Sequence, residues 1–171
     1  MIHGSNSKKN GAFGVKFGAI FHDRREKDSW EDVRKRFNEL EEQMGHAAID
    51  LKETDYPHNN GGFADSVRIS VTPQSHRIYR ITGIVKSDSA EALARKLKSM
   101  LECKYNMTMH SSLSLGADYV FTNEEFSITI DIHSGVEVLI TYTDIALLRL
   151  ARREREQQAQ DEAKNINENV L

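Results

Sequence analysis

The strongest constraint on the fold is a pair of segments, 126–132 and 136–142, in which apolar and polar residues alternate. Alternation with a period of two places successive side chains on opposite faces of a strand, so each segment is predicted to be a half-buried strand. The intervening residues 133–135 are few and include a glycine, which is typical of a hairpin turn. We therefore expect an antiparallel hairpin here. Its apolar residues are Phe126, Ile128, Ile130, Ile132, Val136, Val138, Ile140 and Tyr142.

Four other segments have strand patterns. The segments 67–72 and 78–85 flank a turn at 72–76 and are predicted to form a second hairpin. Because 78–85 carries apolar residues on both faces, we expect it to be a central strand. A short strand is expected at 119–121, and a longer one at 13–21. In the latter, Phe13, Val15, Phe17, Ala19 and Phe21 recur at every second position.

Two amphipathic helices are predicted from apolar residues spaced three and four apart. The first runs from Ser29 to Gly45. The second begins after Asp88, which we expect to be its N-cap, and ends near Asn106. A third helix should be capped by Asp144, lose its apolar residues after one or two turns, and then project and fray. The apolar stripes of the first two are Trp30, Val33, Phe37, Leu40 and Met44, and Ala90, Leu93, Leu97, Met100 and Leu101.

Taken together, these elements predict an α+β fold. We expect a mostly antiparallel sheet of about five to six strands, with two amphipathic helices packed on it and a projecting C-terminal helix. Residues 1–11 are interpreted as a disordered lead-in, 12–150 as a single domain and 151–171 as a polar helical or disordered tail.

Composition and motif spacing argue against several kinds of chemistry. The formal net charge is −3, which gives no overall attraction to nucleic acid or to acidic membranes. Cys103 is the only cysteine, which excludes an intrachain disulfide and a cysteine-based zinc site; we favour a structural role for its thiol. The seven histidines include no pair three to five residues apart, and no phosphate-binding loop or nucleophile elbow is present. We therefore predict no catalytic residue, no cofactor and no metal site.

The compartment stays open at this stage. No apolar run approaches the roughly 20 residues that a membrane-spanning helix needs, so no membrane span is expected. The first ten residues are polar and lack the apolar core of a signal peptide. The protein is therefore either cytoplasmic, or periplasmic after removal of a signal, with residues 1–5 then partly of vector origin.

Two groups of residues are candidates for contacting a partner. Arg149, Arg152, Arg153 and Arg155 lie on the predicted C-terminal helix, and Asn59 and Asn60 lie in a loop that is dense in turn formers. The plainer interpretation is a solvated helix face for the arginines, because Glu154 and Glu156 are interleaved with them, and a surface turn for the asparagines.

The segments 11–18, 67–85 leading into a helix that ends at 103–106, and 138–144 together resemble a group of small bacterial proteins. Many of these are exported and have no assigned function. Their usual opening is Phe-Gly-x-x-Phe-Gly, their middle helix tends to end Lys-Tyr-Gly, and a charged helix follows their last strand. Here Asn106 stands where glycine is typical. The resemblance implies an α+β fold and an envelope location, and it carries no catalytic residues.

Three hypotheses of function follow. The first is a non-enzymatic protein-binding domain, with an immunity or inhibitor-type protein as one concrete version, which engages a protein partner through loops or an exposed sheet face. The second is a nucleic-acid-associated accessory protein that uses the Arg-rich C-terminal helix. The third is an enzyme built from dispersed His and Asp residues. A homo-oligomer is compatible with each.

Overall fold

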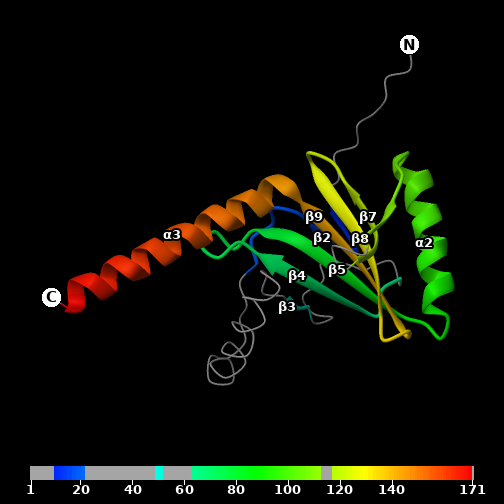
Figure 1. Cartoon of the computed structure of the whole chain (residues 1–171), viewed down its shortest axis with the longest axis horizontal. Coiled ribbons are helices and arrows are strands. Elements are labelled where there is room, and N and C mark those ends of the chain that lie inside the picture. The colour runs from blue at the N-terminus through cyan, green and yellow to red at the C-terminus, as the bar shows by residue number, and fades with distance from the viewer. Residues whose placement is uncertain (1–9, 22–48, 52–62, 113–116, 171) are drawn as a thin grey trace, which may run out of the picture.

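The computed structural model describes residues 10–21, 49–51, 63–112 and 117–170, and it shows an α+β fold (Figure 1). Seven strands form one antiparallel sheet in the order β3-β4-β5-β9-β8-β7-β6, and β1 pairs with β2 in a separate small sheet. The strands are β1 (Gly11–Ala12), β2 (Val15–Lys16), β3 (Ile49–Asp50), β4 (Ser66–Val71), β5 (Ile78–Lys86), β6 (His110–Ser112), β7 (Ala117–Thr122), β8 (Phe126–His133) and β9 (Glu137–Asp144). The helices in the described part are α2 (Ala90–Tyr105) and α3 (Ile145–Val170).

Both predicted hairpins are confirmed. β8 pairs with β9 from Phe126 opposite Asp144 to His133 opposite Glu137, and β4 pairs with β5. Between β8 and β9 both Ser134 and Gly135 have positive φ angles of 54° and 71°, which matches the twist of a tight hairpin turn. β5 also pairs with β9, so the two hairpins lie side by side and β5 is a central strand, as predicted. The short strands β3 and β6 were not predicted.

Helix α2 covers one face of the sheet over β8 and β9. Its buried residues are Ala90, Ala94, Leu97 and Leu101, which pack with Ile128, Ile130, Val138 and Ile140. The prediction that Met100 belongs to this stripe is wrong, because its position on the helix turns it outward and leaves it 55% exposed. The predicted cap is also displaced: the helix begins after Ser89 instead of Asp88, without a side-chain cap. At its other end Asn106 adopts the predicted left-handed conformation.

The predicted continuous strand at 13–21 is wrong. Phe13 and Gly14 have φ angles of 51° and 77° and form the turn of the β1–β2 hairpin, so the chain reverses there. The recurrence of apolar residues at every second position therefore does not mark a single extended strand. It reflects the burial of aromatic side chains on both sides of a turn. Val15 is buried and Phe13 and Phe17 are half-buried, whereas Ile20, on the other side, is 59% exposed.

The Phe13 ring joins the two halves of the core. It lies directly over Gly83 of β5, where a Cβ atom would come within 2.4 Å of the ring. Its centroid is 5.8 Å from that of Tyr142 in an edge-on arrangement and 6.4 Å from that of Phe63 in a stacked one. The cluster beneath α2 and the cluster beneath β1 and β2 both contact Phe13, so this ring closes the apolar face of the sheet.

Helix α3 leaves the sheet directly after β9. Leu147 N donates to Asp144 Oδ1 at 2.9 Å, which confirms the predicted cap. Ala151 is buried where the first turns pack on β5 and β9. From there the helix runs away from the sheet, on the side away from α2 in Figure 1, and continues to Val170. The predicted helix at 29–45 and the loop containing Asn59 and Asn60 lie outside the described residues.

Candidate functional site

A row of polar side chains crosses the sheet on the face opposite α2. Directly paired residues of neighbouring strands project on the same side of a sheet, and the strand pairings connect one residue from each of the seven strands. In order the polar row is Asp50, Arg68, Thr82, Thr141, Thr129, Val120 and His110. All but Val120 are polar, whereas the other face of the same strands carries the buried isoleucines and valines.

The polar row is accessible. The side chains of Arg68 and Asp50, which form an ion pair, are 44% and 63% exposed, and His110 is exposed. In the centre, the Thr82 and Thr141 hydroxyls lie 2.9 Å apart and hydrogen bond to each other, and both residues keep part of their surface in solvent. Hydroxyl and charged groups therefore line this face and are available for hydrogen bonds to another molecule.

Two carboxylates sit beside the row, where β7 and β8 meet. Burial raises the pKa of Asp131, and the negative charge of Asp118 on the neighbouring strand adds to this effect. Asp118 Oδ2 accepts a hydrogen bond from Ile132 N at 2.7 Å, whereas Asp131 Oδ1 is buried without a hydrogen-bond partner. Because like charges on adjacent strands repel, Asp131 retains a proton to higher pH than an isolated aspartate does.

At the other end of the same face, Arg80 of β5 is held in place by the sheet. Its Nε donates to the hydroxyl of the buried Thr143 at 3.2 Å, and its guanidinium carbon lies 5.9 Å from the centroid of the Tyr79 ring. Burial lowers the pKa of Arg80, and the positive charge of Arg152 on α3 acts in the same direction.

Glu154 fastens α3 to the turn between β4 and β5. Its carboxylate accepts hydrogen bonds from Gln74 N at 2.8 Å, from Ser75 N at 3.1 Å and from the Ser75 hydroxyl. Burial alone would raise the pKa of Glu154, but these hydrogen bonds together outweigh burial and hold the pKa below its usual range. Both oxygens of this carboxylate are thus engaged by the β4–β5 turn, which fixes the position of α3 relative to that turn.

The four arginines predicted to contact a partner differ in their exposure. Arg155 turns toward the sheet and hydrogen bonds to Tyr79, whose pKa is raised by burial. Arg149, Arg152 and Arg153 are exposed on α3. Arg152 is the member whose charge reaches Arg80 on the polar face.

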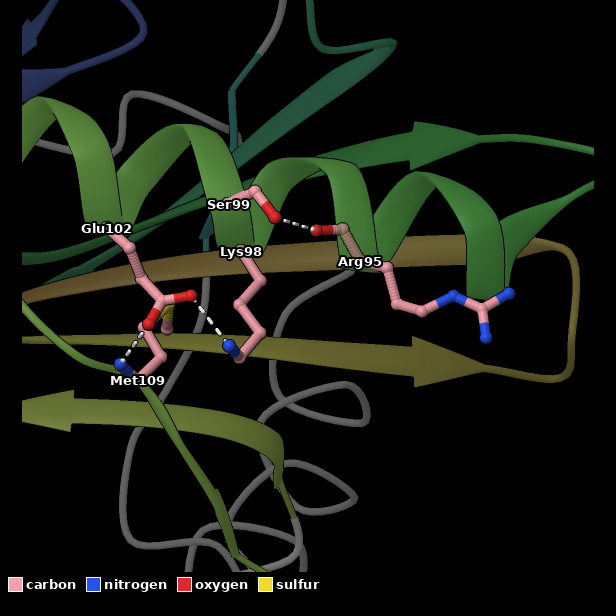
Figure 2. A network of polar contacts seen from close by, with 5 residues as sticks. All are labelled: Arg95, Lys98, Ser99, Glu102 and Met109. Atoms are coloured by element: carbon pink, nitrogen blue, oxygen red, sulfur yellow. Dashed lines mark hydrogen bonds and ion pairs between the residues drawn. The ribbon is translucent and has the colours of Figure 1, made fainter.

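A second polar cluster lies on α2 and has a structural role (Figure 2). Glu102 accepts a hydrogen bond from Lys98 Nζ at 2.6 Å with one oxygen and from Met109 N at 3.1 Å with the other. The hydrogen bond from Lys98, followed by that from Met109, lowers the pKa of Glu102. Because both oxygens are engaged, this cluster ties the chain after α2 back to the helix.

Other candidate chemistry can be placed as follows. Within the described ranges no three His, Cys, Asp or Glu side chains are grouped so that they could hold a metal ion. Cys103 is exposed on α2, so its thiol does not belong to the core. Among the helices of the described residues, none has the length and apolar character needed to cross a membrane.

Comparisons with known proteins give no match to a protein family, a curated protein or a solved structure. The geometry of this chain is therefore the source of any functional argument.

Sequence reasoning missed most of this face. The threonines of β8 and β9 were recognisable as the polar side of each strand, whereas 78–85 was expected to carry apolar residues on both faces. Only the strand order and register bring Thr82 into one row with Thr129 and Thr141. Arg80 carried no signal of its own, because a single arginine in a strand is usually a solvated residue.

Proposed function

We propose that this chain is a non-enzymatic protein-binding domain whose polar row and adjacent basic surface engage an acidic protein partner. An immunity or inhibitor-type protein is the finer version of this proposal. The basic surface consists of Arg80, Arg149, Arg152 and Arg153.

The polar row carries the proposal. The core needs only one face of this sheet, and α2 with the β1–β2 hairpin covers that face. The opposite face presents the partly exposed hydroxyls of Thr82 and Thr141 in a regular array, next to a helix with three exposed arginines. Arginine and hydroxyl groups on the partly exposed face of a sheet suit hydrogen bonding to carboxylates of another protein, and charge complementarity increases the rate of encounter.

The alternative is a nucleic-acid-associated protein that uses the arginines of α3. Its support is that Arg149, Arg152 and Arg153 are exposed on one helix. Glu156, also exposed, lies on the same stretch of helix and opposes the counterion release that drives binding to phosphates. We therefore rank it second.

A pull-down from native-source extract tests the proposal. The tagged chain is compared with Arg152→Glu at the basic surface and Thr141→Lys at the centre of the polar row. Lys96→Glu, a charge reversal at an exposed position of α2 on the other side of the sheet, is the matched control. Each capture is made at low and high salt, with and without nuclease, and read by mass spectrometry.

We expect a stoichiometric protein partner that survives nuclease, is retained by Lys96→Glu and is lost by both surface variants. A partner retained by Arg152→Glu and Thr141→Lys alike would contradict the proposed surface. Capture that disappears on nuclease treatment would instead support the nucleic-acid alternative.

A further inference from the structure

Helix α3 carries its exposed charges in two groups of opposite sign. In the segment 149–155 the exposed charged residues are Arg149, Arg152 and Arg153, because Glu154 is hydrogen bonded to the β4–β5 turn and Arg155 to Tyr79. The distal segment 156–166 is exposed throughout, and its charged residues are three acids and one lysine. These are Glu156, Asp161, Glu162 and Lys164.

The distal segment has few contacts to support it as a helix. In Figure 1 α3 runs away from the sheet, so the core does not cover this part. Gln157 Nε2 donates to Asp161 Oδ1 at 2.9 Å, but none of the ion pairs between described residues involves the segment. A helix that is exposed and polar on all sides is marginally stable in water, so a second helix packed along it would stabilise it.

One stripe of α3 suits such a helix. Its members are spaced four and three residues apart, so they line one side of the helix from end to end. They are Arg152, Glu156, Ala159, Ala163 and Ile166, which we call the pairing stripe. The two alanines permit a close approach of the helix axes, and Ile166 is a large apolar side chain that is 63% exposed.

The sheet leaves the pairing stripe uncovered. Ala151, which is buried where α3 packs on β5 and β9, lies about 100° around the helix from Arg152. Arg152 is exposed, as are all members of the stripe beyond it. Another molecule can therefore contact the stripe along its whole length.

We infer that the pairing stripe binds the same stripe of a second copy of this chain, with the two α3 helices antiparallel. When residue 152 lies opposite 163 of the second copy, residue 156 lies opposite 159, and Arg152 is within one position of the second copy's Glu162. The two-fold axis repeats this contact, so each basic segment meets an acidic one. Glu156 then faces the small Ala159, which leaves its carboxylate room to turn toward solvent. A parallel pair would instead bring like charges together.

This inference goes beyond the proposed function, and charge reversals on the full chain test it. Arg152→Glu and Glu162→Lys each place like charges in contact when a variant pairs with itself. An equimolar mixture of the two variants restores opposite charges at both contacts. The matched control is Lys164→Glu, an exposed charge reversal on the same helix outside the pairing stripe. Dimerisation constants are measured by sedimentation velocity over a concentration series.

We expect the wild-type chain to dimerise and either reversal alone to raise the dimer Kd about tenfold, because two contacts change sign. The mixture should return to the wild-type Kd, and Lys164→Glu should leave it unchanged. A chain that is monomeric at every concentration, reversals without effect, or a mixture no tighter than its components would overturn the pairing.

Pairing and partner binding fail in different ways. Thr141→Lys alters the polar row and should leave the dimer Kd unchanged, even where the partner is lost; loss of the dimer in this variant would overturn α3 as the pairing element. Arg152 belongs to both surfaces, so the doubly substituted chain Arg152→Glu with Glu162→Lys separates its two roles. It should dimerise as the wild type does, and its failure to dimerise would refute the Arg152–Glu162 contact.

Discussion

Replacing Gly83 with alanine is expected to expel the Phe13 ring from the core. The added Cβ atom would lie 2.4 to 2.8 Å from three carbons of this ring, which is far inside van der Waals contact. The ring has no small adjustment available, because its turn is fixed by positive φ angles at Phe13 and Gly14 and the ring is packed against Tyr142 and Phe63.

The magnitude follows from what Phe13 contributes. Truncating a fully buried phenylalanine costs about 3–5 kcal/mol, and because Phe13 is half-buried we expect about 2–3 kcal/mol for Phe13→Ala. Gly83→Ala should cost a similar amount by displacing the same ring. In the Phe13→Ala background the new methyl group has room, and alanine in a strand is favoured over glycine by about 0.5–1 kcal/mol. The coupling energy between the two positions should therefore be about 2.5–4 kcal/mol, which is the cost of Gly83→Ala in the wild-type chain plus its gain in the Phe13→Ala background.

A double-mutant cycle measures this coupling. The four proteins are unfolded in urea and followed by far-ultraviolet circular dichroism, and the free energies of unfolding are compared at a common slope. If the two substitutions prove additive within about 0.5 kcal/mol, Phe13 does not rest on Gly83 and the argument for a single closed apolar face is refuted.

Three further predictions concern carboxylates. Asp131→Asn should raise the free energy of unfolding at neutral pH by roughly 0.5–1 kcal/mol, because it removes a charge that burial and, in addition, the neighbouring Asp118 both disfavour. Since the folded pKa of Asp131 is raised, the gain over wild type should vanish in acid titrations below its ordinary pKa of 3.8. Glu154→Ala should lower the free energy of unfolding in urea near pH 7 by about 1–2 kcal/mol. Because the folded pKa of Glu154 is lowered, the difference in stability between the variant and the wild type should disappear as the pH falls below the ordinary pKa of 4.5 and through the lower folded pKa. An unchanged midpoint would argue against the attachment of α3. Glu102→Ala should speed hydrogen exchange at the amide of Met109, whose hydrogen bond it removes, and unaltered exchange there would show that this contact is dispensable.

The sequence patterns predicted the parts of the fold that are determined locally. The alternating segments ending at Tyr142 and Val85 became strands in the expected hairpins, and Asp144 and Asn106 mark helix ends as their residue types suggested. The failures lie where tertiary contact overrides the pattern. The aromatic residues after Gly11 alternate as in a strand, yet Gly14 permits a reversal and Phe13 is drawn onto Gly83 of a distant strand.

The candidate site was predictable only in fragments. Arg152 was singled out from the charge of α3, whereas Arg80 lies 72 positions earlier in β5, and the packing of α3 on that strand cannot be read from either segment. Likewise Thr82 and Thr141 become adjacent through the pairing of β5 with β9, which joins two hairpins that each looked self-contained. Register between such hairpins is a property of the whole core and is not visible in either segment.

The attachment of Glu154 to residues 74 and 75 also has a mechanical consequence. Beyond this point α3 continues for 16 residues to Val170, a rigid length of about 24 Å. A rotation of only about 10° at the turn would therefore carry the far end of the helix through roughly 4 Å. The direction in which the distant end of α3 projects therefore depends on the hydrogen bonds between Ser75 and Glu154.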